Sequence, residues 1–187
     1  MGLRGSIPLV INGIGLLLQL TAMILYLRLL KDADQKFFQN LPPSVGAFYR
    51  FGLISWIAKV SIQTVVLLPA AAAVSLVLRP FMIGFIHLIL LGFVSGLLFA
   101  LIFSANRPVA ADHWMHWGRL AFVAGFVLTE LLLFVQGLFY WLQWGQLPAY
   151  YELIFAASVL LPLAIILIGI SMIRSYNVKT LSHVMTS

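Results

Sequence analysis

Long apolar runs alternate with short polar breaks along the whole chain. Five of the runs reach the roughly 20 mostly apolar residues that a helix needs to cross a bilayer, where lipid offers no partner for unpaired backbone groups. Charges, prolines and glycines fill the breaks, and these residues end apolar helices. The pattern predicts an all-α fold, a polytopic integral membrane bundle of five transmembrane helices at about residues 7–30, 47–68, 81–103, 117–142 and 150–173.

Composition excludes a soluble globular protein. Hydrophobic residues make up 63% and charged residues 9% of the 187 positions, and the mean hydropathy is +1.07, whereas soluble domains are about half apolar and a quarter charged. The chain has no cysteine, which excludes disulfides, thiolate metal sites and a cysteine nucleophile. No break is long enough for a second domain, so we expect residues 1–187 to form a single transmembrane helical domain.

The basic charge indicates membrane topology rather than nucleic-acid binding. Eleven Lys and Arg against five Asp and Glu give a formal net charge of +6, but these charges flank apolar runs and build no basic face. Cytoplasmic loops carry the excess of Lys and Arg. Five spans leave Arg4 and Arg79 on one side and place eight cations on the other: Arg28, Lys31, Lys36, Arg50, Arg107, Arg119, Arg174 and Lys179. We expect an outside N-terminus and a cytoplasmic C-terminus in a bacterial inner membrane.

The first span follows a very short N-terminal tail. A first helix that enters the membrane from outside in this way is more typical of the second half of a longer bundle. We therefore expect the chain to be one half of a larger assembly, with another membrane subunit or a second copy of itself as the partner.

Three ionisable side chains lie deep inside the predicted spans, away from their ends: Lys59, His87 and Glu130. Such groups are costly in lipid and normally face the bundle interior, which makes them the informative residues of the chain. At 1.5 Å per residue, their predicted depths are ~13, ~20 and ~16 Å from the cytoplasmic boundary. All three are therefore expected near the middle of the bilayer.

These residues predict an intramembrane polar cluster. A lysine and a glutamate at matched depth in neighbouring helices would neutralise each other, so we expect Lys59 and Glu130 to interact. Gln63 lies one turn beyond Lys59 on the same helix face. With His87, the predicted cluster is Lys59, Gln63, His87 and Glu130. It is compatible with a proton path, and equally with polar contacts that only hold helices together.

Two further patterns predict how the first and third spans pack. Asn12, Gln19 and Tyr26 recur every seven residues, which places them on one helix face that should turn inward. Gly92 and Gly96 give the third span a surface of small residues. We expect this surface to approach a neighbouring helix closely.

His87 is the residue with the most specific chemistry. An imidazole inside a span can ligate haem iron or copper, carry protons, contact a quinone, or only hydrogen-bond a neighbouring helix. No other histidine lies inside a predicted span. A haem or copper site at His87 would therefore need ligands from another chain, and the cofactor stays open.

A second, weaker candidate site lies at the start of the fourth span. Asp112 is a candidate N-cap, and His113 and His116 lie three residues apart on one helical face. Two imidazoles and one carboxylate could hold a metal ion, although histidines at a cytoplasmic boundary are more commonly just interfacial. No Ser-His-Asp set, glycine-rich phosphate loop or carboxylate pair is present, so no reaction type is assigned.

Three stretches together resemble a group of membrane proteins: residues 59–63 (KVSIQ), 85–92 (FIHLILLG) and 125–137, which contains GFVLTE and FVQG. They are similar, over about residues 47–174, to the C-terminal part of bacterial multispan proteins distantly similar to the NnrS family and to haem-copper oxidase subunit I. The resemblance implies a respiratory or nitric-oxide-related membrane protein in which His87 corresponds to a histidine of a haem- or copper-binding helix. Those longer proteins carry a His-rich helix pair that this chain lacks, which implies a partial version or a subunit that needs a partner.

Two functions from different classes remain open. In the first, the polar cluster of a redox-associated bundle contacts a haem, a quinone or a proton path. In the second, the same residues only lock together the helices of a non-catalytic membrane scaffold. A small proton-coupled carrier is a third, less favoured alternative.

Overall fold

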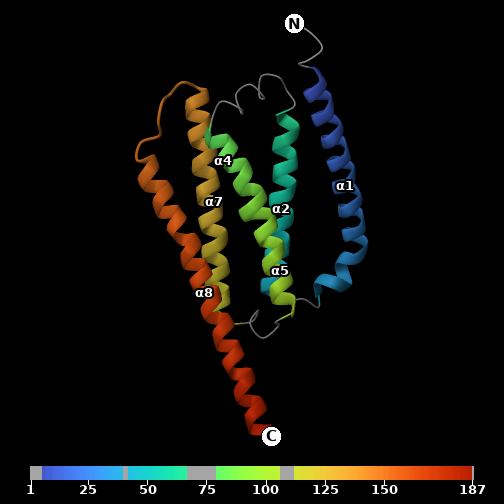
Figure 1. Cartoon of the computed structure of the whole chain (residues 1–187), viewed down its shortest axis with the longest axis vertical. Helices are drawn as coiled ribbons and strands as arrows, with labels where there is room; N and C mark the ends of the chain where they lie inside the picture. Colours follow the sequence, from blue (N-terminus) through green and yellow to red (C-terminus); the bar gives the residue numbers. More distant parts are fainter. Residues whose placement is uncertain (1–5, 40–41, 67–78, 106–111, 187) are drawn as a thin grey trace.

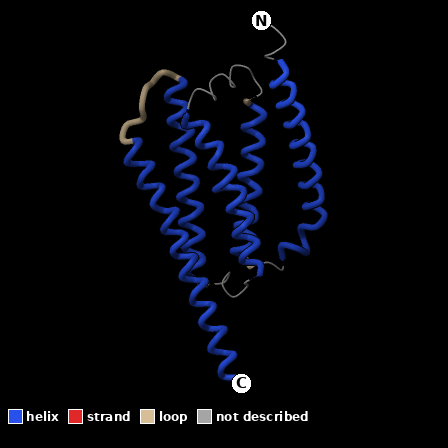
Figure 2. Tube along the Cα trace, viewed as in Figure 1, coloured by secondary structure: helices blue, strands red, loops and turns tan. Residues whose placement is uncertain are grey.

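The computed structural model is all-helical over the residues that it describes, which are 6–39, 42–66, 79–105 and 112–186. Five helical spans are long and apolar enough to cross a membrane, and the described residues form no strand (Figure 2). The predicted fold class is therefore confirmed. These helices are those of a multi-pass integral membrane protein.

The five spans begin and end near the predicted positions. The first, second, fourth and fifth are single helices: α1 (Ser6–Gln39), α2 (Pro43–Val65), α7 (His113–Trp141) and α8 (Tyr150–Thr186). The third span consists of three consecutive segments: α4 (Arg79–His87), the π-helix η1 (Leu88–Val94) and α5 (Ser95–Ala105).

Two helices, α1 and α8, continue well beyond their predicted ends. Those ends, at about residues 30 and 173, mark where the apolar run stops, but a helix continues into water until a breaker ends it. At 1.5 Å per residue, α8 is ~55 Å long and exceeds the ~30 Å hydrocarbon thickness of a bilayer. Its C-terminal part extends beyond the other helices (Figure 1).

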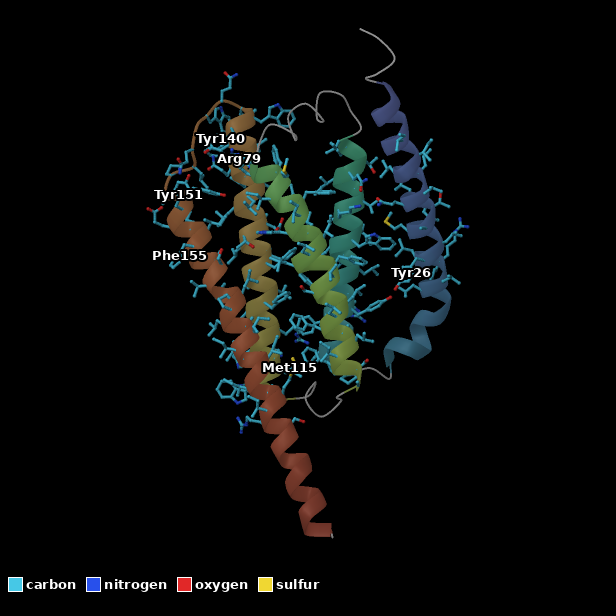
Figure 3. The ribbon with its side chains drawn as sticks, viewed as in Figure 1. Tyr26, Arg79, Met115, Tyr140, Tyr151 and Phe155 are labelled. Atoms are coloured by element: carbon cyan, nitrogen blue, oxygen red, sulfur yellow. The ribbon has the colours of Figure 1, made fainter. Side chains whose placement is uncertain are left out.

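The bundle has two distinct ends. Figure 3 places Arg79, Tyr140 and Tyr151 at one end, the Arg79 end, and Met115 toward the opposite end, the Met115 end. α2 and α7 begin at the Met115 end, and α1 and α5 finish there (Figure 1). Most of the described cations therefore belong to the helix parts toward the Met115 end, as the loop assignment predicted: Arg28, Lys31, Arg50, Arg119 and Arg174. Lys59 and Arg79 lie toward the Arg79 end. Which end faces the cytoplasm stays a prediction.

The helices differ in how firmly they are packed. α8 packs along α7, α2 packs along η1 and α5, and α4 packs against α7 (Figure 1). α1 packs mainly on α2, and Leu16 is the single buried residue among its described side chains. α1 is therefore the most loosely attached of the five spans.

The main apolar core lies toward the Met115 end. Phe48, Phe103 and Met115 are fully buried there. The rings of Phe48 and Phe99 have centroids 5.0 Å apart, and Phe99 meets Phe122 edge to face at 5.2 Å. Such ring pairs add about 0.5–1.5 kcal/mol each beyond their buried area. These aromatic contacts join α2, α5 and α7.

Glycines bring the third span into backbone contact with α2, which confirms the expected close approach. A Cβ atom on Gly96 would lie 2.9 Å from Cα of Gly52 and 3.1 Å from the carbonyl oxygen of Phe48. A Cβ atom on Gly92 would lie 2.6 Å from Cβ of Ser55. The helices thus lie closer together than side chains at these positions would allow.

Replacing one of these glycines should therefore destabilise the bundle. Gly96→Ala should lower the free energy of unfolding by about 1–3 kcal/mol, because the added methyl group meets backbone atoms. Gly169→Ala is the matched control: a Cβ atom there has no neighbour within 4 Å, so alanine should be neutral or stabilise by up to about 1 kcal/mol. Detergent unfolding followed by circular dichroism compares the two variants. Equal midpoints would contradict the close contact.

Candidate functional site

His87 and Glu130 meet inside the bundle. His87 is the last residue of α4, Glu130 lies in α7, and His87 Nδ1 is 3.3 Å from Glu130 Oε1. The side chain of Glu130 is 8% exposed, whereas that of His87 is 34% exposed. The bundle therefore encloses the carboxylate, and the imidazole reaches from it toward the surface.

The polar atoms at this contact have unused hydrogen-bonding capacity. The approach of Nδ1 to Oε1 has the distance of an ion pair but does not meet the geometry of a hydrogen bond. Nδ1 and both carboxylate oxygens of Glu130 are buried and make no hydrogen bond within the described part of the chain. Buried polar atoms in this state are uncommon in native proteins, and a catalytic role or an absent ligand is one of the recognised reasons for them.

A glycine one turn before His87 makes room for the carboxylate. A Cβ atom on Gly84 would lie 3.2 Å from Glu130 Oε2 and 3.2 Å from a ring carbon of Phe134. A side chain at this position would displace the carboxylate or push α7 away from α4. Gly84 thus allows the contact between His87 and Glu130.

The third span changes its backbone hydrogen-bond pattern directly after His87. Residues 88–94 form the π-helix η1, and the hydroxyl group of Ser95 donates to the carbonyl oxygen of Leu90 at 2.9 Å. π-helical turns are rare and frequently occur at functional sites. Because a π-helix has a wider turn than an α-helix, η1 sets the rotation of His87 relative to α5.

Lys59 does not pair with Glu130, so this prediction is wrong. The Lys59 ammonium donates a hydrogen bond to Gln19 Oε1 on α1 at 3.0 Å and lies 5.7 Å from the ring centre of Phe85. Matched depth along the sequence does not reveal which helices are neighbours. In the structure α4 packs on α7 and brings His87, instead of Lys59, to the carboxylate.

The rest of the predicted polar cluster is only partly assembled. Gln63 Oε1 is buried and makes no hydrogen bond to any described residue.

Along the helix axes, Lys59, His87 and Glu130 lie ~9, ~12 and ~16 Å from the helix ends at the Arg79 end. The site thus lies toward that end of the bundle, and its depth in a bilayer stays a prediction.

The predicted inward face of α1 is confirmed where its side chains are described. Gln19 binds Lys59, and the hydroxyl groups of Tyr26 and Tyr49 hydrogen-bond each other between α1 and α2. The side chain of Asn12 lies outside the described residues. Polar contacts therefore make up much of the attachment of α1, because its apolar burial is small.

The predicted cap at the start of the fourth span forms, whereas the structure does not group Asp112, His113 and His116 around one point, and the metal site stays a prediction. Asp112 accepts a hydrogen bond from the backbone N–H of His113 at 2.9 Å. The Trp117 indole donates to His113 Nε2 at 2.8 Å, and the Arg119 guanidinium lies 3.2 Å from His116 Nδ1. Across the described ranges, no three His, Cys, Asp or Glu side chains are placed to hold a metal ion. Side chains of the same helix, Trp117 and Arg119, therefore contact one ring nitrogen of each histidine.

A polar residue that sequence reasoning passed over, Gln136, holds the connection between α7 and α8. It is fully buried. Its Oε1 accepts from the backbone N–H of Leu147 at 2.9 Å, and its Nε2 donates to the carbonyl oxygen of Gly145 at 3.5 Å. The connection takes up left-handed backbone at Gln143, Gly145 and Ala149. The sequence contained one signal for this role, which is a glutamine inside an apolar span, shortly before a glycine.

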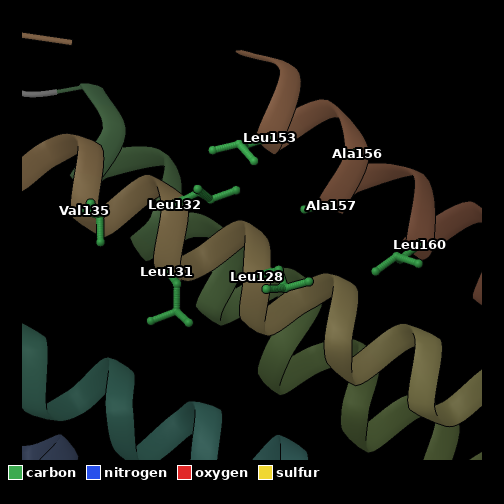
Figure 4. Close-up of a pocket in the computed structure, with 8 residues that line it drawn as sticks. All are labelled: Leu128, Leu131, Leu132, Val135, Leu153, Ala156, Ala157 and Leu160. Carbon is green, nitrogen blue, oxygen red and sulfur yellow. The ribbon is translucent and has the colours of Figure 1, made fainter. Parts of the chain in front are cut away.

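A groove of about 410 Å³ between α7 and α8 offers no chemistry of its own (Figure 4). Apolar side chains alone line it: Leu128, Leu131, Leu132, Val135, Leu153, Ala156, Ala157 and Leu160. It contains neither residue of the His87–Glu130 contact. The groove is therefore a surface for hydrocarbon, and the polar contact remains the candidate site.

No protein-family model, curated protein or solved structure matches this chain. The resemblance to the NnrS family and to haem-copper oxidase subunit I therefore stays a prediction. The function has to be argued from the contacts of His87 and Glu130.

The contact predicts energetic coupling between its two residues. Either His87→Leu or Glu130→Met alone leaves the other polar group buried and unpaired. The losses in free energy of unfolding of the two single variants should therefore add up to more than the loss in the double variant. We expect the double variant to be less destabilised than the sum of the single ones by about 0.5–3 kcal/mol. A dodecyl sulfate titration of the purified protein measures the free energy of unfolding for each variant.

Lys59 provides the control for this cycle. Because Lys59 contacts Gln19 instead of Glu130, the effects of Lys59→Met and Glu130→Met should add to within about 0.5 kcal/mol. Strong coupling of Lys59 with Glu130, together with additive effects of His87 and Glu130, would contradict the observed pairing.

Proposed function

We propose that this chain is a redox-associated membrane subunit in which Glu130 orients His87, so that the other ring nitrogen, Nε2, binds haem iron or copper held jointly with another chain. The observation that carries the proposal is the 3.3 Å contact between a buried carboxylate and a part-exposed imidazole. Five helices long and apolar enough to cross a membrane provide its setting.

The orientation of the imidazole supports a ligand role. A histidine that ligates a metal almost always directs its other ring nitrogen to a carboxylate, a carbonyl or water, which fixes the tautomer and raises the basicity of the ligating nitrogen. Glu130 has this position relative to His87. Because Nδ1 is buried while the ring as a whole is part-exposed, Nε2 is the nitrogen that a ligand can reach.

The donor set of this chain fits a single ligand position. The other histidines whose side chains are described, His113 and His116, lie at the Met115 end and contact Trp117 and Arg119. The remaining ligands would therefore come from a partner subunit or a second copy. When bound, such a haem or copper ion supplies one-electron transfer, while this chain binds and orients it. The resemblance to haem-copper oxidase subunit I points to the same histidine.

A non-catalytic scaffold is the rival function, in which His87 and Glu130 only join α4 to α7. A purely structural contact between α4 and α7 needs no accessible ring nitrogen. The 34% exposure of the His87 side chain therefore favours the redox function. The two functions differ in whether the purified protein carries a chromophore or copper.

Protein produced with added haem should show a Soret absorption band that His87→Ala removes while the circular dichroism of the helices is unchanged. His113→Ala, which removes an imidazole at the other end of the bundle, should keep the band. Glu130→Gln should weaken binding roughly 10–100-fold, because the amide orients the imidazole less well. No bound haem or copper in any preparation would refute the redox function and favour the scaffold.

The distribution of cations supports a cytoplasmic Met115 end and an outside N-terminus in a bacterial inner membrane. Lys31, Arg50 and Arg119 are among the cations at that end. Positive residues are retained on the cytoplasmic side during insertion. The Arg79 end, with the candidate site nearer to it, would then face outward.

The absence of native cysteine allows a direct test of this orientation. In intact cells, a membrane-impermeant maleimide should label Gln146→Cys, which lies in the exposed connection between α7 and α8. Ser187→Cys should be labelled only after the cells are opened. The opposite labelling pattern would reverse the orientation without affecting the contact of His87 with Glu130.

A further inference from the structure

Lys59 is a cation inside a span without an acidic partner among the described residues. Its ammonium makes one hydrogen bond there, to the neutral amide of Gln19, and one cation–π contact, with Phe85. A charged side chain in a bilayer is costly and is normally paired. An ammonium has three N–H donors, so two remain for another group.

The chain has few acids that could pair with Lys59. The five in the sequence are Asp32, Asp34, Asp112, Glu130 and Glu152. Glu130 is ion-paired with His87. Asp32 and Asp34 follow Gln19, the α1 residue that binds Lys59, by ~20 Å or more along the axis of α1. Glu130 is therefore engaged elsewhere, and the positions of Asp32 and Asp34 along α1 are remote from Gln19.

The two other acids are also remote from Lys59. Asp112 caps α7 at the Met115 end. Glu152 is exposed in the first turn of α8, a helix that packs on α7 rather than on α1 or α2. The segments outside the described residues contain no Asp or Glu. The described residues therefore place no acid beside Lys59, which leaves this position open to an anion from outside the chain.

Gln63, one turn beyond Lys59, indicates which chemical groups a binding partner of Lys59 would carry. Gln63 is closer to the Arg79 end on the same face of α2. Its Oε1 is buried and accepts no hydrogen bond from the described residues. From the Arg79 end inward, this face of α2 therefore presents the acceptor atom Gln63 Oε1 and then the two remaining N–H donors of the Lys59 ammonium. A ligand that matches both residues carries an anionic group for Lys59 and, beside it, a hydroxyl group for Gln63.

We propose that Lys59 and Gln63 bind the headgroup of an anionic phospholipid with hydroxyl groups, which enters along α2 from the Arg79 end. The phosphate oxygens accept from the Lys59 ammonium, and a headgroup hydroxyl donates to Gln63 Oε1 once the Gln63 side chain rotates out of its enclosed position. Lys59 lies ~9 Å from the end of α2, and its long side chain extends the ammonium toward such a headgroup.

The position of α1 favours a lipid over a partner helix. α1 covers Lys59 through the hydrogen bond to Gln19, so a carboxylate on a partner helix would first have to displace α1. A lipid headgroup approaches along the helix axis from the membrane surface and leaves that hydrogen bond in place. α1 also has only Leu16 buried among its described side chains, so the helix pair can adjust to a headgroup at small cost.

The test measures the thermal unfolding midpoint of the full chain in neutral detergent while lipid is added. Phosphatidylglycerol should raise the midpoint by about 3–6 °C at roughly ten times its dissociation constant, whereas zwitterionic phosphatidylcholine should not. Lys59→Met should abolish the rise and Lys59→Arg should keep it. Gln19→Leu is the matched control, because it breaks the same hydrogen bond but retains the cation, and it should keep the rise.

Several outcomes would overturn the proposal. An equal rise in Lys59→Met would place lipid binding elsewhere, and no rise in the unmodified chain would show that Lys59 needs no lipid anion. An equal rise with inorganic phosphate would assign a free anion. A change of Lys59→Met from oligomer to monomer would assign the counter-charge to a partner chain. If Lys59→Met does not fold, Lys59→Gln removes the same charge with a polar side chain.

Discussion

The contact between His87 and Glu130 ties the third span to the fourth, because the enclosed carboxylate would be costly without a partner. Three local features accompany it. Gly84 has no side chain where the carboxylate approaches, α4 packs on α7 at this height, and the π-helix η1 adjusts the rotation of the span just after the imidazole. The bundle encloses the carboxylate and leaves the imidazole part-exposed, which is the geometry that the proposed ligand role requires.

The two ends of the bundle have different packing. Interlocked aromatic rings and glycine contacts join α2, α5 and α7 toward the Met115 end. Toward the Arg79 end, Gln63, His87 and Glu130 have polar atoms with unused hydrogen-bonding capacity. Along its length, α1 is held to α2 by the Gln19–Lys59 and Tyr26–Tyr49 hydrogen bonds and the Tyr26–Trp56 ring contact, with little apolar burial.

Because acidic residues are scarce, the proposed redox site at His87 and the proposed lipid site at Lys59 are separate. Glu130 is the single acid of the sequence that lies away from the ends of the spans, and it contacts His87. Lys59 is therefore left to Gln19, Phe85 and a partner from outside the chain. The redox role depends on the accessible side of His87, whereas the lipid role depends on α2 and its contact with α1. Either can fail without the other.

The sequence by itself determined what depends on local chemistry. Apolar run length gives five spans, Asp112 caps α7 because its carboxylate lies beside free backbone N–H groups, and Gly92 and Gly96 allow close approach because they lack side chains. Only the tertiary structure decided which polar groups meet. Depth along a helix does not specify its neighbour or its rotation, so the pairing of Glu130 with His87, the π-helix and the isolation of Lys59 from acids depend on how α4 packs against α7.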